Sequence, residues 1–235
     1  MKLNMRYIAI TLLFVVSLFA TSVASTNTEP VAAAAPFVSS RCGNTGNKVL
    51  LVFDDYPISS KKWKALIRTA HRNNIGIGVA PTGSYVKSGL ADVGFAHQYG
   101  MLVVDHAYAH KYLTELPYKK VVWQITRPYN GSNYVRPPYG AYNKKVLKAF
   151  KNTGKYNCMW NLDPRDWDGR TPEKAARYII RHAQKGSTAV VHLNHLGTKP
   201  NLLITIKEGL AKRGIKMCKP WDKKTPVIMP ASYCD

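Results

Sequence analysis

The sequence predicts an α/β fold in which about seven parallel strands alternate with helices. Short apolar runs alternate along the chain with longer stretches that have the periodicity of amphipathic helices. Glycines follow several helical stretches, at Gly154, Gly186 and Gly214, where a helix C-terminus favours them. Polar residues follow several apolar runs, as expected where the carboxyl ends of parallel strands form a site. These observations fit either an open doubly wound sheet or a barrel.

Each expected strand is a short apolar run, and the expected helices lie between most of the strands. The strands are expected at residues 48–53, 75–80, 101–104, 133–135, 156–162, 187–192 and 215–218. The helices are expected at residues 59–73, 86–98, 117–127, 140–152, 172–185 and 200–213. Thr171 followed by Pro172 is typical of an N-cap with a proline in the first turn, which supports a helix start there.

The N-terminus has the features of a cleaved secretory signal peptide, assigned to residues 1–25. Basic residues precede the apolar run Tyr7–Ala20, and small residues follow it. Ser22–Ala24 is the expected cleavage signal, and Ala33–Ala35 is a later alternative. Because the apolar run is short for a bilayer span, we expect no stable membrane span and a location outside the cell or in the cell wall.

Residues 26–40 are rich in Ala, Thr, Ser and Pro and are expected to form a flexible linker before a single domain, residues 41–235. With 46% hydrophobic residues the chain can bury a sizeable core. The formal net charge of +21 is spread along the chain and favours anionic partners such as cell-wall polymers. Neither a basic stripe nor a nucleic-acid-binding module is recognisable, so no nucleic-acid partner is expected. The protein is expected to be a monomer.

Four cysteines, Cys42, Cys158, Cys218 and Cys234, can form disulfides if the chain is exported. Three pairings are possible, and sequence alone does not choose among them. A zinc site made of the four thiolates is not expected, because no two of them have the close C-x-x-C type of spacing.

Two adjacent carboxylates, Asp54 and Asp55, follow the apolar run Leu50–Phe53 at the end of the first expected strand. Ionising two neighbouring carboxyl groups is costly unless a cation or an arginine lies nearby. A solvated acidic turn is the alternative for such a pair taken alone. The polar residues after the other strands favour a functional site instead.

His106 and His110 stand four residues apart after the third expected strand, on one face if the segment is helical. This spacing suits two ligands of one zinc ion, with a carboxylate as the third ligand and an open position for water. A purely structural pair is the alternative. The carboxylates expected at the same edge favour the metal site.

Three further segments place polar side chains after expected strands. Arg136 begins a stiff, proline-containing turn that holds a guanidinium at a strand end. Asp163–Trp167 follows the fifth strand, and His192 ends the sixth. Surface turns and a buried core histidine are the alternatives for these segments taken one at a time.

Five motifs in this order resemble those of the NodB-like polysaccharide deacetylases, carbohydrate esterase family four. The resemblance extends over about residues 49–217, and a single motif is weak whereas five in order are specific. The motifs are Val52–Pro57 (family pattern T-F-D-D-G-P), His106–His110 (H-x-x-x-H), Arg136–Gly140 (R-P-P-Y-G), Asp163–Trp167 (D-x-x-D-W) and Val190–His192 (L-x-H).

The resemblance implies a distorted (β/α) barrel, the NodB homology domain, and metal-dependent removal of N- or O-linked acetyl groups. Asp55, His106 and His110 would bind the metal, most often zinc in this family, with cobalt or nickel as alternatives. Asp54 would be the general base for the attacking water, and Arg136 would pair with it.

The same resemblance implies further roles at the site. The backbone N–H of Tyr139 would stabilise the oxyanion, and His192, its pKa raised by Asp166, would protonate the leaving group. Trp167 and Val190 would form the walls of the pocket that takes the acetyl methyl group.

A disulfide between Cys42 and Cys218, as in small secreted relatives, is also implied by the resemblance and would leave Cys158 to pair with Cys234. Each bridge would contribute about 2–4 kcal/mol to stability.

The chain departs from the family pattern in places that affect the substrate more than the mechanism. Val52 replaces Thr, Tyr56 replaces Gly and Leu193 replaces Asp. The segment between Leu116 and Arg136 is also several residues shorter than usual. Tyr56 adds a ring at the rim of the site and is expected to contact substrate.

The expected function is that of a secreted deacetylase acting on an N-acetylglucosamine polymer, such as chitin oligomers or peptidoglycan. An O-acetylxylan esterase is the alternative within the family. A catalytically inactive, basic cell-wall-binding module is the alternative outside enzymes. That module predicts a missing ligand or base, and the sequence contains all of them.

Overall fold

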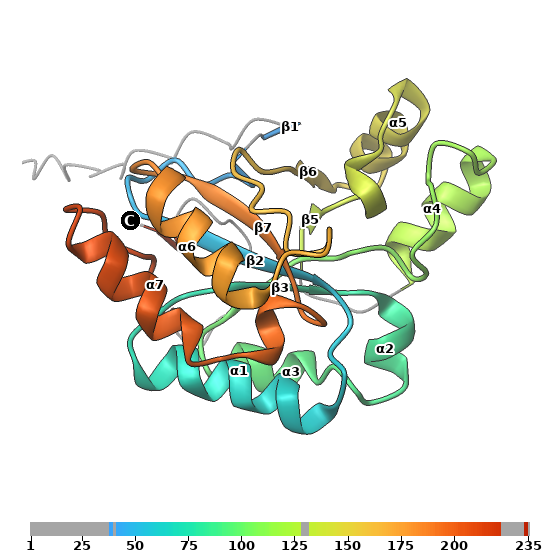
Figure 1. Ribbon diagram of the computed structural model, residues 1–235. Coiled ribbons are helices and arrows are strands. Elements are labelled where there is room, and N and C mark those ends of the chain that lie inside the picture. Colours follow the sequence, from blue (N-terminus) through green and yellow to red (C-terminus); the bar gives the residue numbers. More distant parts are fainter. Residues whose placement is uncertain (1–37, 40, 128–131, 222–232, 235) are drawn as a thin grey trace, which may run out of the picture. The chain divides into compact units, whose positions relative to one another are not determined.

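The computed structural model of the chain describes residues 38–39, 41–127, 132–221 and 233–234 (Figure 1). The expected signal peptide, residues 1–25, and residues 26–37 and 40 of the expected linker lie outside these, so the domain boundaries stay predictions. No helix in the described part of the chain is long and apolar enough to cross a membrane.

A four-stranded parallel sheet forms the centre of the fold. Its order is β4 (Leu102–Val103), β3 (Gly78–Pro81), β2 (Leu50–Asp55) and β7 (Thr188–His192). Residues 50–54 of β2 are buried, as is typical of a parallel strand that has both faces covered. The register places Asp54 directly beside His192 of β7. Backbone pairing alone therefore makes these two polar side chains neighbours.

A second parallel sheet completes the barrel. Its order is β1 (Val38–Ser39), β6 (Tyr156–Cys158) and β5 (Tyr134–Val135). Single bridges join the two sheets at both sides, between Asp105 and Val135 and between Leu162 and Ala189. The strands therefore close into a ring, and the expected distorted (β/α) barrel is confirmed.

Two strand predictions differ from the structure. The strand expected at residues 215–218 is reduced to one bridge, from Met217 to Val49. Strand β1 forms in residues expected to be linker, because Val38 and Ser39 pair with the free edge of β6. The expected count of about seven strands therefore does not describe the same seven segments.

Helices surround the strands of the barrel (Figure 1). The α-helices of the described residues are α1 (Ser60–Arg72), α2 (Gly83–Lys87), α3 (Val93–Gln98), α4 (Tyr118–Thr126), α5 (Lys144–Asn152), α6 (Pro172–His182) and α7 (Leu202–Ala211). Thr171 caps α6 as predicted, because its side chain accepts a hydrogen bond from the N–H of Lys174. The helix expected at residues 86–98 is two helices, since Gly89 adopts φ 78° after α2 and Asp92 caps α3.

The helix expected from residue 140 begins later, at Lys144. The residues before it form a short 3₁₀ helix, η1 (Pro138–Gly140), and the side chain of Asn143 accepts from the N–H of Val146. The start of α5 is therefore set by a capping side chain and not by the proline-containing turn.

Strand β2 separates two parts of the hydrophobic core. Leu51 and Phe53 pack with residues of α1, α6 and α7, whereas Leu50 and Val52 pack with residues of β3, β4, β5 and β6 inside the barrel. Because side chains alternate along a strand, Asp54 lies on the interior face with Leu50 and Val52.

The disulfides pair Cys42 with Cys158 and Cys218 with Cys234, so the expected pairing is wrong. The reason is strand β1, which the sequence did not indicate. Its register places Ser39 opposite Cys158, and Cys42 follows three residues later on the same segment. Spacing along the chain carries no information about this neighbour.

Removing either disulfide should lower the free energy of unfolding, and the longer loop should lose more. The Cys42–Cys158 bridge spans 116 residues and the Cys218–Cys234 bridge spans 16. Chain entropy predicts losses of about 5 and about 3 kcal/mol. Urea unfolding of the Cys42→Ala/Cys158→Ala and Cys218→Ala/Cys234→Ala variants without reductant measures both, and a larger loss for the second variant would contradict the prediction.

Candidate metal and acid–base site

A cavity of about 500 Å³ is lined by polar side chains from the carboxyl ends of the strands. Asp54 and Asp55 come from β2, His106 and His110 from the segment after β4, and His192 from β7. All five are predicted site residues. Parallel strands bring them together because their carboxyl ends share one edge of the barrel.

The predicted substrate-contacting residues differ in their positions. Tyr139, Trp167 and Val190 line the cavity, with Trp167 exposed and Val190 buried. Tyr56 lies outside the cavity lining, and its ring stacks on that of Tyr85 with 4.9 Å between centroids. The walls of the cavity are therefore aromatic and apolar, and Tyr56 belongs to a neighbouring surface.

Two imidazoles and one carboxylate converge in the cavity. Nε2 of His106 and Nε2 of His110 lie 3.2 and 3.1 Å from Oδ1 of Asp55. The three ligand atoms all lie within 4.8 Å of one another. Nδ1 of His106 donates to the carbonyl oxygen of Arg136 at 2.8 Å, which orients the ring so that Nε2 is the nitrogen that faces Asp55 and could bind a metal. This donor set fits a divalent ion such as zinc.

The protonation of Asp55 also suits a metal ligand. Burial by itself raises the pKa of Asp55, but the hydrogen bonds with His106 and His110 outweigh burial and hold the pKa well below its usual range. Asp55 is therefore a carboxylate at neutral pH.

The two histidines converge although their segment is not helical. Their spacing of four residues was expected to place them on one face of a helix. The segment that contains them has no helical turn, and Ala107 adopts φ 57°. If side chains alternated regularly to the end of β2, that of Asp55 would point toward the helices. Asp55 instead adopts φ 75°, and the chain turns at this residue. Local backbone geometry aims these ligands.

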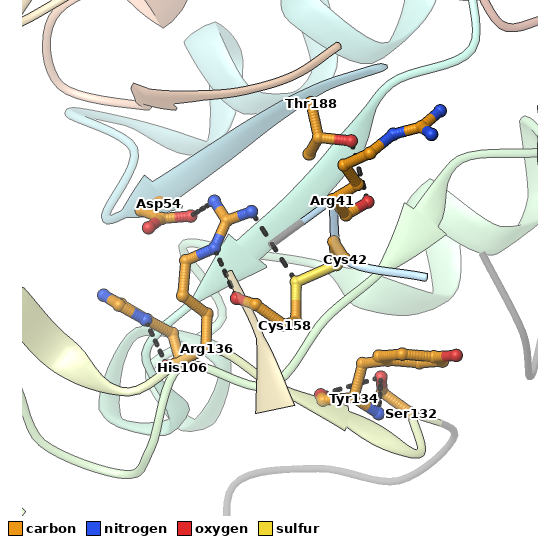
Figure 2. Close-up of a disulfide and its surroundings, with 9 residues drawn as sticks. All are labelled: Arg41, Cys42, Asp54, His106, Ser132, Tyr134, Arg136, Cys158 and Thr188. Carbon is orange, nitrogen blue, oxygen red and sulfur yellow. Dashed lines mark hydrogen bonds and ion pairs between the residues drawn. A yellow bond between two sulfur atoms is a disulfide. The ribbon is translucent and has the colours of Figure 1, made fainter. Parts of the chain in front are cut away.

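Asp54 is held by a fully buried arginine (Figure 2). Nη1 of Arg136 donates to Oδ1 of Asp54 at 2.8 Å. Burial lowers the pKa of Arg136, and the charge and hydrogen bond of Asp54 oppose this effect. Removing either partner would leave an uncompensated buried charge, so the two residues depend on each other.

His192 is oriented by the buried carboxylate of Asp166. Nδ1 of His192 donates to Oδ1 of Asp166 at 2.7 Å, and Oδ2 of Asp166 accepts from the backbone N–H groups of His192 and Leu196. Burial lowers the pKa of His192, but Asp166, and then the charges of Asp54 and Asp55, outweigh it, so the net shift is upward. His192 therefore keeps its proton to higher pH than an ordinary histidine.

Tyr139 combines a special backbone with an aromatic contact. Its φ is 61°, and within the described residues no acceptor takes its backbone N–H. Its ring stacks on that of Tyr112 at 4.0 Å and meets His110 edge-on at 4.4 Å. The N–H thus remains able to bind an oxygen that develops negative charge.

Two aromatic lining residues, Tyr112 and Trp160, were not predicted. Trp160 lies just after β6, so its position after a strand was an available signal. The Arg136 guanidinium lies 5.4 Å from the centre of its ring. Tyr112 gives no such signal, because its position depends on the turn that follows His110.

The model of the polysaccharide deacetylase family matches residues 43–157, which contain the segments of Asp54, His106 and Arg136. Over these residues the chain is similar to the members of this family. Its motifs for the remaining site residues, Asp166 and His192, lie beyond the matched range.

Named members of the polysaccharide deacetylase family resemble the chain over much of its length. It is 27% identical over 173 residues to the peptidoglycan-N-acetylglucosamine deacetylase PgdA of Listeria monocytogenes, which covers 69% of this chain and 36% of that protein. It is 24% identical over 188 residues to the bifunctional xylanase/xylan deacetylase of Cellvibrio japonicus, with 73% and 27% covered. The chain therefore spans about a third of the length of these relatives.

A solved structure has the same fold. The family 4 carbohydrate esterase from Streptomyces lividans in complex with acetate matches with a TM-score of 0.66 at 22% identity. The match covers 79% of this chain and 99% of that chain.

The metal ligands can be tested by binding alone. Mutating a residue that hydrogen-bonds to a metal ligand typically lowers the metal affinity about 10- to 100-fold. Losing the ligand itself should cost more, so the His110→Ala variant should bind zinc at least about 100-fold more weakly. Titration of the chelated protein with zinc measures this affinity. His182→Ala, on the exposed face of α6, is the matched control. Equal zinc affinity in the His110→Ala and wild-type proteins would exclude this ligand set.

Proposed function

We propose that the chain is a secreted, metal-dependent hydrolase that removes acetyl groups from an N-acetylglucosamine polymer, such as peptidoglycan or chitin oligomers. One observation carries the proposal. Asp54, which pairs with the buried Arg136, and His192, which pairs with Asp166, line one cavity with the Asp55–His106–His110 cluster. A base, an acid and a metal-binding group are the components that hydrolysis of an acetyl amide needs.

Asp55, His106 and His110 would hold the metal, with zinc the first candidate and cobalt or nickel the alternatives. When bound, such an ion polarises the acetyl carbonyl and makes water more acidic. Two neutral imidazoles and one carboxylate leave a net positive charge on a divalent ion. That charge supports both effects.

The chain's own residues would move the protons. Asp54, oriented by Arg136, takes a proton from water as the water oxygen attacks the acetyl carbon. The backbone N–H of Tyr139 donates to the carbonyl oxygen as that oxygen becomes negative. His192 gives its Nε2 proton to the leaving nitrogen as the carbon–nitrogen bond breaks. The products are acetate and a free amine.

The cavity walls support a sugar substrate. Trp167 and Val190 would enclose the acetyl methyl group, and the stacked rings of Tyr112 and Tyr139 would lie against a sugar face. A relative named as a peptidoglycan-N-acetylglucosamine deacetylase supports the N-acetylated polymer. The relative named as a xylan deacetylase supports the O-acetylxylan esterase as the second candidate.

The location and the partners belong to the same proposal. Two disulfides fit an oxidising compartment, and the net charge of +21 would hold the protein near anionic cell-wall polymers. We infer a monomer that works outside the cell or in the cell wall, with no nucleic-acid partner.

Acetate release tests the activity directly. Chelated protein, before and after zinc is restored, is incubated with peptidoglycan, chitin oligomers and acetylxylan. We expect release only with zinc and fastest from an N-acetylated polymer, and an Asp54→Asn loss of at least about 100-fold. Asp92→Asn is the matched control, because asparagine caps α3 equally well. No release from any polymer by the folded, zinc-loaded protein would favour the inactive wall-binding module.

The pH dependence tests the role of His192. Its raised pKa keeps the acid form up to higher pH, so activity should fall only as the pH rises through that value. Asp166→Asn removes the charge and hydrogen bond that raise the pKa, and its amide oxygen can still accept from the backbone. The alkaline limb of kcat/KM should therefore move to lower pH. An unchanged limb would remove His192 from the role of general acid.

A further inference from the structure

The disulfide between Cys42 and Cys158 lies against the guanidinium of Arg136 (Figure 2). Nε of Arg136 donates to the carbonyl oxygen of Cys158 at 3.0 Å, and Nη2 lies 3.6 Å from the Cys158 sulfur. Both cysteines and Arg136 are fully buried. The bridge is therefore in direct contact with the residue that holds Asp54.

The hydrogen bonds of Arg136 show how much of its orientation depends on Cys158. A guanidinium presents its N–H donors in a rigid plane. Nη1 bonds to Asp54, whereas Nε and Nη2 both bond to Cys158, and within the described residues the sulfur is the only acceptor for Nη2. Two of the three nitrogens thus depend on one cysteine, so a shift of Cys158 turns the plane that meets Asp54.

The segment around Cys158 is joined to its neighbours by short pairings. It ends the three-residue strand β6, which pairs through two residues with β5 and two with β1. Beyond β6, the next described hydrogen bonds to β7 come from Asn161 and Leu162, which bond with Thr188 and Val190. The disulfide adds a covalent link at this side of the barrel, because it joins Cys158 to Cys42.

The other end of the bridge is anchored on β7. Nε of Arg41 donates to the carbonyl oxygen of Gly186 at 2.6 Å, and the hydroxyl of Thr188 donates to the carbonyl oxygen of Arg41 at 2.8 Å. Cys42 follows Arg41 directly. The bridge therefore connects the start of β7 to the residue that positions Arg136.

We propose that the Cys42–Cys158 disulfide is a positioning element of the active site, which fixes Arg136 and through it the base Asp54. The catalytic part of this inference rests on the proposed deacetylase function. We do not assign this positioning role to the Cys218–Cys234 disulfide. The backbone of Cys218 bonds to Val49, at the opposite end of β2 from Asp54.

Kinetics of two matched double variants test the catalytic consequence. At a temperature where both are folded, Cys42→Ala/Cys158→Ala should lose kcat about tenfold or more with KM within about twofold, because misplaced catalytic groups affect the chemical step. Cys218→Ala/Cys234→Ala should keep kcat within about twofold of the wild type. Equal kcat values in the two variants would overturn the proposal, since lost stability alone would then explain any effect.

A second measurement does not depend on activity. The Nε proton of Arg136 is buried and bonded to Cys158, so its NMR signal, assigned through Arg136→Lys, should exchange slowly with solvent. It should exchange faster in Cys42→Ala/Cys158→Ala and remain slow in Cys218→Ala/Cys234→Ala. Faster exchange without acetate release from the wild type would count against the proposed function and not against the positioning. Unchanged exchange would overturn the positioning.

If Cys42→Ala/Cys158→Ala does not fold, reduction of the remaining bridge in the Cys218→Ala/Cys234→Ala protein decides the question. A phosphine reductant converts the bridge into two thiols, which are counted as they form. Loss of the Arg136 Nε signal before the amide signals of β2 supports the proposal. Loss of both sets together overturns it, because the bridge would then only stabilise the whole domain.

Discussion

The buried guanidinium of Arg136 is the interaction on which the rest of the site depends. Nη1 of the guanidinium holds Asp54, and the other two nitrogens bond to Cys158. The backbone carbonyl of Arg136 orients His106. A charge with no exposed surface is tolerated only because these acceptors surround it. The bridge between Asp105 and Val135 brings the residue before His106 beside the residue before Arg136. Closing the barrel and assembling the site are therefore one event.

Strained backbone conformations gather at this site. Asp55, Ala107, Tyr139 and Arg165 all have positive φ values between 52° and 75°, and each lies within one of the site segments. Such conformations cost about 1–3 kcal/mol each and persist only where the surrounding packing imposes them. Here they aim a carboxylate, two imidazoles and an N–H into one cavity. The apolar strands behind them supply the stability that offsets this cost.

Much of the fold could be read from the chain, because the signals were local. Apolar runs with turn residues predicted most of the strands, and the capping residue Thr171 predicted the start of α6. The predicted strand at residues 215–218 was wrong. An apolar run in the sequence does not indicate whether the edge of a neighbouring strand is free to pair with it. Strand β1 was missed for the converse reason: its two residues are defined only by the edge of β6 that they cover.

The sequence by itself indicated most of the polar residues that line the cavity, since polar side chains placed after buried parallel strands meet at one edge. It also indicated the family that the chain resembles, through the order of five short motifs. Only the tertiary structure decided that Cys42 pairs with Cys158, that Tyr112 and Trp160 line the cavity, and that Arg136 rests on a disulfide. These facts depend on distances between segments far apart in the chain. Such distances are set when the barrel closes, and no local pattern in the sequence contains them.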